Sequence, residues 1–214
     1  MDRLYVDQVK KMFLAATELI LEKEPYLTEI DSMIGDGDHG EGMARGCRAV
    51  KKRLETDSYD FVDDLCYAVS TELIKTMGGA SGVLFGTMFL GGISLLEHRE
   101  YTTAKELAEY FQAGECSVER RGKASPGQKT MLDALYPACV AMKETAAKTT
   151  RIEDLFRNGF QAAVKGAEES KNMRSRTGRS KNFKDKTLGI PDPGAVSVSF
   201  WFQGFDKAIN TEGK

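Results

Sequence analysis

The sequence feature that most constrains the fold is an apolar repeat with a spacing of three and four residues, which recurs along most of the chain. This spacing places apolar side chains on one face of a helix. In the first segment the repeat consists of Val6, Val9, Phe13, Ala16 and Ile20. It returns in six further segments, at residues 43–54, 62–77, 83–96, 104–118, 131–142 and 152–166. The sequence therefore predicts an all-α fold.

Three segments refine this expectation. Residues 83–96 are apolar nearly all round, so we expect them to form the most buried helix. Pro137 is expected to bend the helix at 131–142 or to lie near its start. Residues 195–202 alternate between apolar and small or polar side chains, as a strand would. Because a lone strand among helices would have no partner, a final helix is favoured there.

Length and charge narrow the class of protein. With 214 residues, one domain covering residues 1–214 is favoured over two. The chain has 30 Lys and Arg against 32 Asp and Glu, and this balance gives no sign of the basic surface that binds nucleic acids. Residues 76–96 contain no charged side chain and are long enough to span a bilayer. Their glycines and the lack of a second span favour a buried helix after a glycine loop, so we expect no membrane partner.

The cysteines indicate a reducing compartment. They form no C-x-x-C pair, and the chain has only two histidines, so a zinc site is not expected. The first residues also lack the apolar run of a signal peptide. We therefore expect a cytoplasmic protein with free, mostly buried thiols. The cysteines are Cys47, Cys66, Cys116 and Cys139.

The strongest chemical signal is the stretch DSMIGDGDHG at residues 31–40. Its three carboxylates, on Asp31, Asp36 and Asp38, lie within eight residues, and the glycines let the backbone turn sharply enough for them to converge. Ionised carboxylates this close repel one another, and a hard cation such as Mg²⁺ would relieve that repulsion. The alternative is a solvated acidic turn that caps a helix starting near Glu41. The spacing alone leaves both interpretations open.

Two familiar motifs fit this stretch poorly. Gly35, Gly37 and Gly40 match the G-x-G-x-x-G pattern of dinucleotide sites. However, the aspartates beside them would repel a pyrophosphate, and no clear strand precedes them. An EF-hand counted from Asp36 would need Glu at its twelfth position, where Cys47 stands. Neither motif is therefore predicted.

Three more connections carry unusual chemistry, in addition to the connection expected at residues 27–42. Residues 78–82, GGASG, precede a helix, where free backbone amides attract phosphate and small residues also allow close packing. Residues 122–130, GKASPGQKT, nearly match the P-loop pattern, but Gln128 separates glycine from lysine, so an anion-friendly loop is favoured. Residues 175–194 are long and basic, which fits a lid over phosphate, a docking surface or a solvated loop.

Taken together, these stretches resemble a known family. The segments IGDGDHG, GGASG, RGKASPGQKTMLDAL and GRS…DPGA occur in this order between Asp31 and Ala195. The combination is similar to that of the L subunit of dihydroxyacetone kinase, a DAK2-domain protein. The resemblance implies a closed barrel of about eight antiparallel helices, with a nucleotide bound at one end.

The resemblance also implies the residues of the site. In the family, three aspartates hold two Mg²⁺ ions that bridge the phosphates of ADP or ATP, and Asp31, Asp36 and Asp38 match them here. Arg179 matches the arginine of a lid over the phosphates and would act in catalysis. The other nucleotide-binding positions are matched by His39, Gly40, Glu41, Gly42, Ala80, Ser81, Gly122, Met131, Asp192, Pro193 and Gly194.

The implied function is phosphoryl transfer to a short ketose held by a separate K subunit, without which this chain would be inactive as a kinase. Some family members keep ADP, which a phosphocarrier (M) subunit of the phosphotransferase system rephosphorylates, whereas others exchange ATP. His39 resembles the first type, because many ATP-dependent relatives have Cys there.

Two departures from the family pattern leave alternatives open. Gly42 stands where the family usually has Asn, and residues 180–191 diverge from the usual lid. An L subunit of a related ketose kinase, for example an erythrulose-type enzyme with exchangeable ATP, is therefore a second interpretation. A nucleotide-sensing regulatory module is a third. A homodimer is compatible with each of them.

Overall fold

The computed structural model describes residues 1–211 and confirms the predicted all-α class. Within these residues the two strands, β1 (Leu4–Tyr5) and β2 (Tyr101–Thr102), form one short antiparallel ladder near the N-terminus. The α-helices are α1 (Val6–Glu22), α2 (Glu24–Ile34), α3 (His39–Thr56), α4 (Val62–Thr76), α5 (Gly79–Leu90), α6 (Ala104–Gly122), α7 (Leu132–Ala146), α8 (Ile152–Glu169) and α9 (Pro193–Thr211). Three 3-10 helices lie in the connections: η1 (Ile93–Leu95), η2 (Ser170–Asn172) and η3 (Ser180–Thr187).

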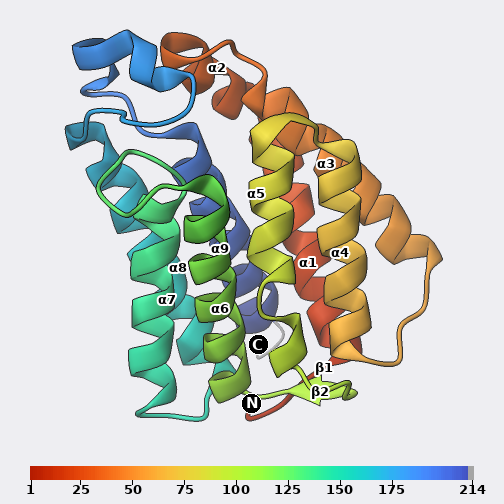
Figure 1. Cartoon of the computed structure of the whole chain (residues 1–214). Helices are drawn as coiled ribbons and strands as arrows, with labels where there is room; N and C mark the ends of the chain where they lie inside the picture. Colours follow the sequence, from red (N-terminus) through yellow and green to blue (C-terminus); the bar gives the residue numbers. More distant parts are fainter. Residues whose placement is uncertain (212–214) are drawn as a thin grey trace.

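Eight of the helices in the described part of the chain form a ring. α1 packs against α3, each helix from α3 to α8 packs against the next, and α9 packs against α1. Neighbouring helices run in alternating directions, and α2 and η3 lie together at the end of the ring far from the N-terminus (Figure 1). The connections that precede α3, α5, α7 and α9 all reach this end (Figure 1). The four stretches with unusual chemistry therefore gather in one place.

The ring closes around large apolar side chains. The ring centre of Trp201 in α9 lies 5.0 Å from that of Phe89 in α5, and the ring centre of Phe13 in α1 lies 5.2 Å from Phe89. All three side chains are fully buried. At the contact between α1 and α9, a Cβ atom on Gly204 would lie 2.3 Å from the Cα atom of Ala16. Glycine at this position lets α9 approach α1 closely enough to close the ring.

Helix α2 corrects one sequence prediction, because residues 27–34 are helical and not part of a connection over 27–42. Only Lys23 lies between the end of α1 and the start of α2. Pro25 lies in the first turn of α2, where a backbone N–H would have no partner within the helix. The helix has only 11 residues, so its apolar repeat is too short to stand out in the sequence. Its buried residues are Leu27, Ile30 and Ile34.

The most buried helix is α9, and not the segment 83–96 that the sequence favoured. α5 ends at Leu90, whose side chain is 39% exposed, and a separate 3-10 helix follows it. α9 packs against α1, α7 and α8 and buries even the hydroxyl-bearing Ser197 and Ser199. The Oγ atom of Ser199 donates to the carbonyl of Val196 at 2.7 Å, so burying it leaves no polar group unpaired. The predicted final helix is confirmed.

Several smaller expectations can be compared with the structure. Pro137 lies inside α7. The four cysteines are free, and three of them are buried: Cys47, Cys66 and Cys139, whereas Cys116 is exposed. Within residues 1–211, none of the helices combines the length and the apolar character needed to cross a bilayer.

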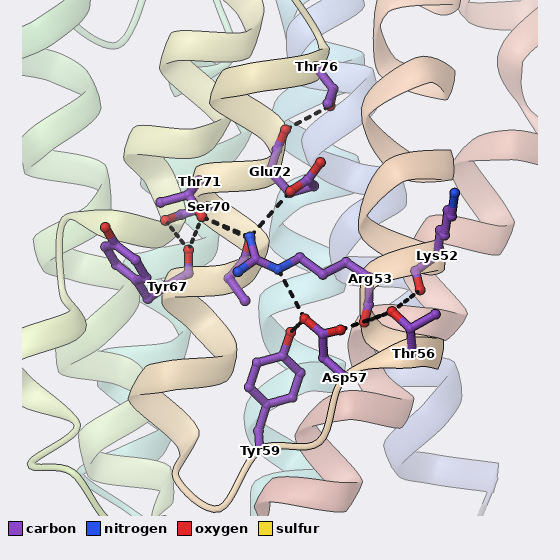
Figure 2. A network of polar contacts seen from close by, with 11 residues as sticks. Lys52, Arg53, Thr56, Asp57, Tyr59, Tyr67, Ser70, Thr71, Glu72 and Thr76 are labelled. Carbon is purple, nitrogen blue, oxygen red and sulfur yellow. Dashed lines mark hydrogen bonds and ion pairs between the residues drawn. The ribbon is translucent and has the colours of Figure 1, made fainter.

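Arg53 connects the C-terminal half of α3 to α4 through a network of polar contacts (Figure 2). Its Nη1 atom lies 3.2 Å from Oε2 of Glu72 and donates to Oγ1 of Thr71 at 3.3 Å. Its Nε atom lies 3.5 Å from Oδ2 of Asp57, which also accepts from the hydroxyl of Tyr59. This network holds α4 against α3, whose opposite end lines the cavity described below.

Candidate functional site

The end of the ring that carries the four unusual stretches contains a cavity of about 620 Å³. It is walled by residues from α2, α3, α5, α6, the connection before α7, and the segment before α9. All the site residues expected from the sequence line this cavity except Gly40 and Glu41. Those that line it are Asp31, Asp36, Asp38, His39, Gly42, Ala80, Ser81, Gly122, Met131, Arg179, Asp192, Pro193 and Gly194.

An acidic cluster stands on one side of the cavity. Carboxylate oxygens of Asp31 in α2 and of Asp36 and Asp38 in the following turn all lie within 4.8 Å of one another. The turn depends on Gly35, because a Cβ atom there would lie 2.3 Å from Oδ1 of Asp31. The backbone N–H of His39 donates to Oδ2 of Asp31 at 3.1 Å, which fixes this carboxylate against the start of α3. Repulsion among the three carboxylates is thus built into the fold.

A cation from a distant part of the sequence offsets this negative charge. The guanidinium of Arg179 forms ion pairs with Asp36 and with Asp38, whose Oδ2 atom lies 3.1 Å from Nη1. A positive group therefore already lies against two of the three carboxylates. The ligand atoms in the cluster are all oxygens, which Mg²⁺ prefers over nitrogen or sulfur. The residues present accordingly fit a hard divalent cation.

His39 begins α3 and points toward α9. Its Nε2 atom lies 2.8 Å from the Oγ atom of Ser197, and both side chains are buried. Burial lowers the pKa of His39 to about 4, although the nearby Asp31 carboxylate opposes this change. The imidazole is therefore neutral at neutral pH and adds no positive charge to the acidic cluster.

Opposite the aspartates, a glycine turn precedes α5. Gly78 and Gly79 have φ angles of 76° and 60°, which side chains rarely adopt. Ala80 and Ser81 then lie in the first turn of α5, where the backbone N–H groups have no partner within the helix. Free amides at a helix N-terminus, together with the helix dipole, favour phosphate groups.

Arg45 of α3 supports this turn, although no sequence motif pointed to it. Its Nε atom donates to the carbonyl of Thr76 at 2.8 Å, and its Nη2 atom donates to that of Met77 at 2.5 Å. These are the last carbonyls before the glycine turn. A Cβ atom on Gly42 would lie 3.9 Å from Nη2 of Arg45, so the guanidinium also lies beside Gly42.

The remaining wall of the cavity is largely apolar. Gly122 at the end of α6 lies against Leu84, since a Cβ atom on this glycine would lie 3.4 Å from the leucine Cδ2 atom. Ligand pockets are usually lined mainly by apolar side chains, with a few polar groups that fix the orientation of the ligand, and this cavity has both. The apolar lining residues are Ile34, Met77, Val83, Leu84, Phe85, Val118, Ala124, Met131 and Leu132.

The segment from Ser170 to Ile190, here called the lid, closes the cavity from the side of α8. Thr177, Gly178, Arg179 and Ser180 are the lid residues that line the cavity. After the lid, Asp192 accepts a hydrogen bond from the backbone N–H of Ala195 at 2.8 Å at the start of α9. Burial raises the pKa of Asp192 to about 7, and the Asp133 carboxylate adds to this effect.

Gly40 and Glu41 lie at the start of α3 but do not line the cavity. A Cβ atom on Gly40 would lie 2.2 Å from Oγ1 of Thr28, so this glycine allows α2 to approach α3. Glu41 is exposed and forms an ion pair with Arg45 at 3.4 Å. α3 starts at His39, slightly before the start near Glu41 that the sequence indicated.

The fold and the cavity define an all-helical domain with an acidic centre at one end of a ring of helices. The chain belongs to the DAK2 domain family, whose model matches residues 33–207. It is 32% identical, over 87% of its length, to "PEP-dependent dihydroxyacetone kinase, ADP-binding subunit DhaL" of Escherichia coli (strain K12), and it covers 89% of that protein.

Two further relatives extend the comparison to kinases with longer chains. The chain is 28% identical, over 92% of its length, to L-erythrulose kinase of Pectobacterium atrosepticum, of which it covers 34%. Its structure matches the crystal structure of the dihydroxyacetone kinase from C. freundii in complex with AMP-PNP and Mg²⁺ with a TM-score of 0.73 and 26% identity. That match covers 93% of this chain and 33% of the other. The chain is thus a member of a family of kinases and kinase subunits.

Proposed function

We propose that the chain is the nucleotide-binding subunit of a dihydroxyacetone-type kinase and holds ADP or ATP with two Mg²⁺ ions. One observation carries this proposal: the carboxylates of Asp31, Asp36 and Asp38 converge opposite a glycine turn at a helix N-terminus, within one cavity. The free amides attract a phosphate group. The carboxylates repel the same phosphate unless a cation lies between them and the phosphate. A magnesium-bound nucleotide satisfies both sides of the cavity.

The proposed arrangement gives each part of the cavity a task. Bound Mg²⁺ would neutralise phosphate charge, and the three aspartates would hold it. The amides of Ala80 and Ser81 would bind phosphate oxygens, while the apolar wall around Met131 and Gly122 would contact the base and ribose. His39, Gly42 and the segment 192–194 would complete the nucleotide site.

Arg179 is the residue for which we propose a catalytic role. Phosphoryl transfer depends mainly on positioning and on neutralising the charge that spreads over the transferred group. A guanidinium can offer two parallel N–H donors to phosphate oxygens. Because Arg179 lies on the lid and pairs with Asp36 and Asp38, it is close to where a phosphate on Mg²⁺ would lie.

The acceptor and the phosphate donor are assigned from the relatives. Several of them are named as ADP-binding subunits of PEP-dependent kinases, which favours a ketose site on a separate K subunit and a phosphocarrier as donor. We therefore propose that this chain alone transfers no phosphate to a ketose. A cytoplasmic location and a homodimer remain predictions from the sequence.

A related ketose kinase is the second candidate. The chain shares 28% identity with an L-erythrulose kinase, and it differs from the usual family pattern at Gly42 and over residues 180–191. A four-carbon ketose and exchangeable ATP would fit this alternative. The nucleotide site itself would be the same, so only the acceptor and donor distinguish the two candidates.

Reconstitution tests the proposal. The chain is mixed with a purified K subunit, dihydroxyacetone or erythrulose, and either Mg²⁺-ATP or a phosphoenolpyruvate-driven phosphocarrier, and sugar phosphate is measured with a coupled dehydrogenase. Turnover that requires both subunits and is lost in Asp38→Asn supports the proposal. Nucleotide binding without turnover in any combination would favour the nucleotide-sensing module instead.

A further inference from the structure

Lys129 is a buried lysine at the end of the ring that carries the cavity. Its side chain is 1% exposed although it carries an ammonium group. Burying a charge is costly unless hydrogen bonds replace the water that it loses. The Nζ atom of Lys129 donates to the carbonyl of Ser170 at 2.7 Å and to the carbonyl of Ile190 at 2.6 Å. These two residues are the first and the last of the lid.

The connection before α7 places the ammonium group of Lys129 between the two ends of the lid. Lys129 has a φ angle of 61°, in the left-handed region that residues other than glycine rarely adopt. Asp133 in the first turn of α7 holds the loop in place, because its carboxylate accepts from the backbone N–H groups of Gly127 and Thr130. The strained backbone of Lys129 is thus maintained by the loop around it.

The two ends of the lid are further joined to each other. The backbone N–H of Gly189 donates to the carbonyl of Lys171 at 2.8 Å, and that of Asp192 donates to the Oγ atom of Ser170 at 2.9 Å. The Asp192 and Asp133 carboxylates lie near Lys129 and oppose the lowering of its pKa by burial. The ends of the lid therefore form a closed base, in which Ser170, Lys129 and Asp192 are buried.

The tip of the lid is held very differently. Arg179 contacts Asp36 and Asp38 through ion pairs, but its side chain is 65% exposed, and those of the aspartates are 46% and 67% exposed. Exposed ion pairs contribute little to stability and weaken with salt. The base of the lid is thus fixed by the charge-assisted hydrogen bonds of the buried Lys129. Nearer the tip, Arg179 is held by exposed ion pairs, and the backbone N–H of Arg176 donates to the carbonyl of Gln128 at 3.2 Å.

We propose that Lys129 is a positioning residue that pins both ends of the lid, so that the lid opens and closes at its tip and returns Arg179 to the aspartates. Anchoring of the lid does not depend on the identity of the ligand. The further claim that this anchoring sets nucleotide affinity rests on the proposed function.

Limited trypsin digestion of the folded chain tests the anchoring without any ligand. The lid offers trypsin seven sites, at Lys171, Arg174, Arg176, Arg179, Lys181, Lys184 and Lys186. Lys129→Met keeps the aliphatic stem but removes both hydrogen bonds to the lid. We expect lid cleavage to accelerate by about tenfold or more, since a hydrogen bond to a charged group contributes on that order. Lys123→Met, at an exposed lysine of the same loop, should cleave like the wild type.

An internal control separates lid opening from a general loss of stability. Arg151 is exposed between α7 and α8, away from the lid. Faster cleavage confined to the lid supports the proposal. Unchanged lid cleavage in Lys129→Met, or an equal increase at Arg151, overturns it.

Hydrogen exchange on the wild-type chain keeps the proposal testable if Lys129→Met does not fold. Peptides that contain the amides of Gly189 and Asp192 should exchange more slowly than peptides from the tip around Arg179, both with and without Mg²⁺-ADP. Equal exchange at the base and the tip would overturn the anchoring. One further outcome separates the two claims. If Lys129→Met folds and its lid is cleaved faster, but its dissociation constant for Mg²⁺-ADP is unchanged, then the anchoring of the lid is supported. Only the claim that this anchoring sets nucleotide affinity then fails.

Discussion

The Nη1 atom of Arg179 lies 3.1 Å from Oδ2 of Asp38, although 141 residues separate them in the sequence. Asp38 immediately precedes α3, whereas Arg179 belongs to the lid between α8 and α9. The ring of helices brings these two segments to the same end (Figure 1). This contact is the reason to treat the lid and the aspartates as parts of one site.

Asp38→Asn tests the role of the acidic cluster. The substitution removes one charge from the cluster without changing side-chain volume. We expect the affinity for Mg²⁺-ADP to fall at least about 100-fold. Losing a residue that only hydrogen-bonds to a metal ligand usually costs about 10- to 100-fold, and Asp38 is proposed to hold the metal itself. The helical circular-dichroism spectrum should not change. Asp185→Asn, at a lid carboxylate that pairs with Arg174 outside the cavity, serves as the control. Mg²⁺-dependent affinity retained in Asp38→Asn would contradict the metal assignment.

Two glycines near the cluster should respond to alanine in opposite ways. A Cβ atom at Gly35 would collide with the Asp31 carboxylate at 2.3 Å, whereas one at Gly42 meets its nearest atom, the carbonyl of Met77, at 3.5 Å. Gly35→Ala should lower the unfolding free energy by about 1–3 kcal/mol and weaken nucleotide binding, because Asp31 must move. Gly42→Ala should raise the unfolding free energy by up to about 1 kcal/mol, since Gly42 lies within α3.

Urea denaturation of both variants measures these effects. The result that would contradict the expectation is a Gly35→Ala protein as stable as Gly42→Ala. The tight turn at residues 35–38 would then not depend on glycine, and the convergence of the carboxylates would need another explanation.

Much of the fold could be predicted from the sequence, because long amphipathic helices show a clear three- and four-residue spacing of apolar residues. Helix α2 could not, since it offers only three buried apolar residues next to the end of α1. The burial of α9 was also underestimated. Ser197 and Ser199 read as polar in the sequence, but their hydroxyls find partners in His39 and in the carbonyl of Val196.

The site shows a similar division. Most residues expected from the motifs meet in one cavity, because the four unusual stretches occupy the same end of the ring. Arg45 and Lys129 were missed, since the sequence does not tell which Lys or Arg side chain donates hydrogen bonds to backbone carbonyls of another segment. The near match of residues 122–130 to a P-loop was the available signal for Lys129. In the structure its ammonium binds the carbonyls of Ser170 and Ile190.

The raised pKa of Asp192 predicts a pH dependence of stability. In the folded chain this carboxyl titrates at about pH 7, against its ordinary value of 3.8, so the folded state holds an extra proton between these values. Stability from this group is therefore present at low pH and is lost as the pH rises toward 7. Asp192→Asn has no such proton to lose and still caps α9.

As the pH rises, the unfolding free energy of Asp192→Asn should therefore increase relative to that of the wild type. We expect an increase of roughly 2 kcal/mol between about pH 5 and about pH 7, and little further change above that. Urea midpoints of the nucleotide-free proteins across this range give the answer. Parallel pH profiles for the two proteins would show that burial does not hold the proton on Asp192.

Arg53 should matter for stability but not for the nucleotide. Its contacts with Thr71 and Glu72 join α3 to α4, and its contact with Asp57 joins it to the connection between these helices (Figure 2). Arg53→Met should lower the unfolding free energy by about 1 kcal/mol, because the partly exposed pair and its hydrogen bonds are lost. Lys105→Met, which removes only an exposed pair with Glu109, should have almost no effect.

Calorimetry of Mg²⁺-ADP binding separates these two roles. Unchanged affinity in Arg53→Met is the expected result. A marked loss of affinity would mean that the packing of α3 on α4 around Arg53 also positions the residues of the cavity.

The most direct test of the central claim is a calorimetric titration of ADP into nucleotide-stripped protein, with Mg²⁺ and with a chelator. We predict binding that requires Mg²⁺, because the carboxylates of Asp31, Asp36 and Asp38 would otherwise repel the phosphates. Very tight binding would indicate a resident ADP, and micromolar or weaker binding an exchanging nucleotide. No binding, or equal affinity in the chelator, would contradict the proposal that this cavity holds a magnesium nucleotide.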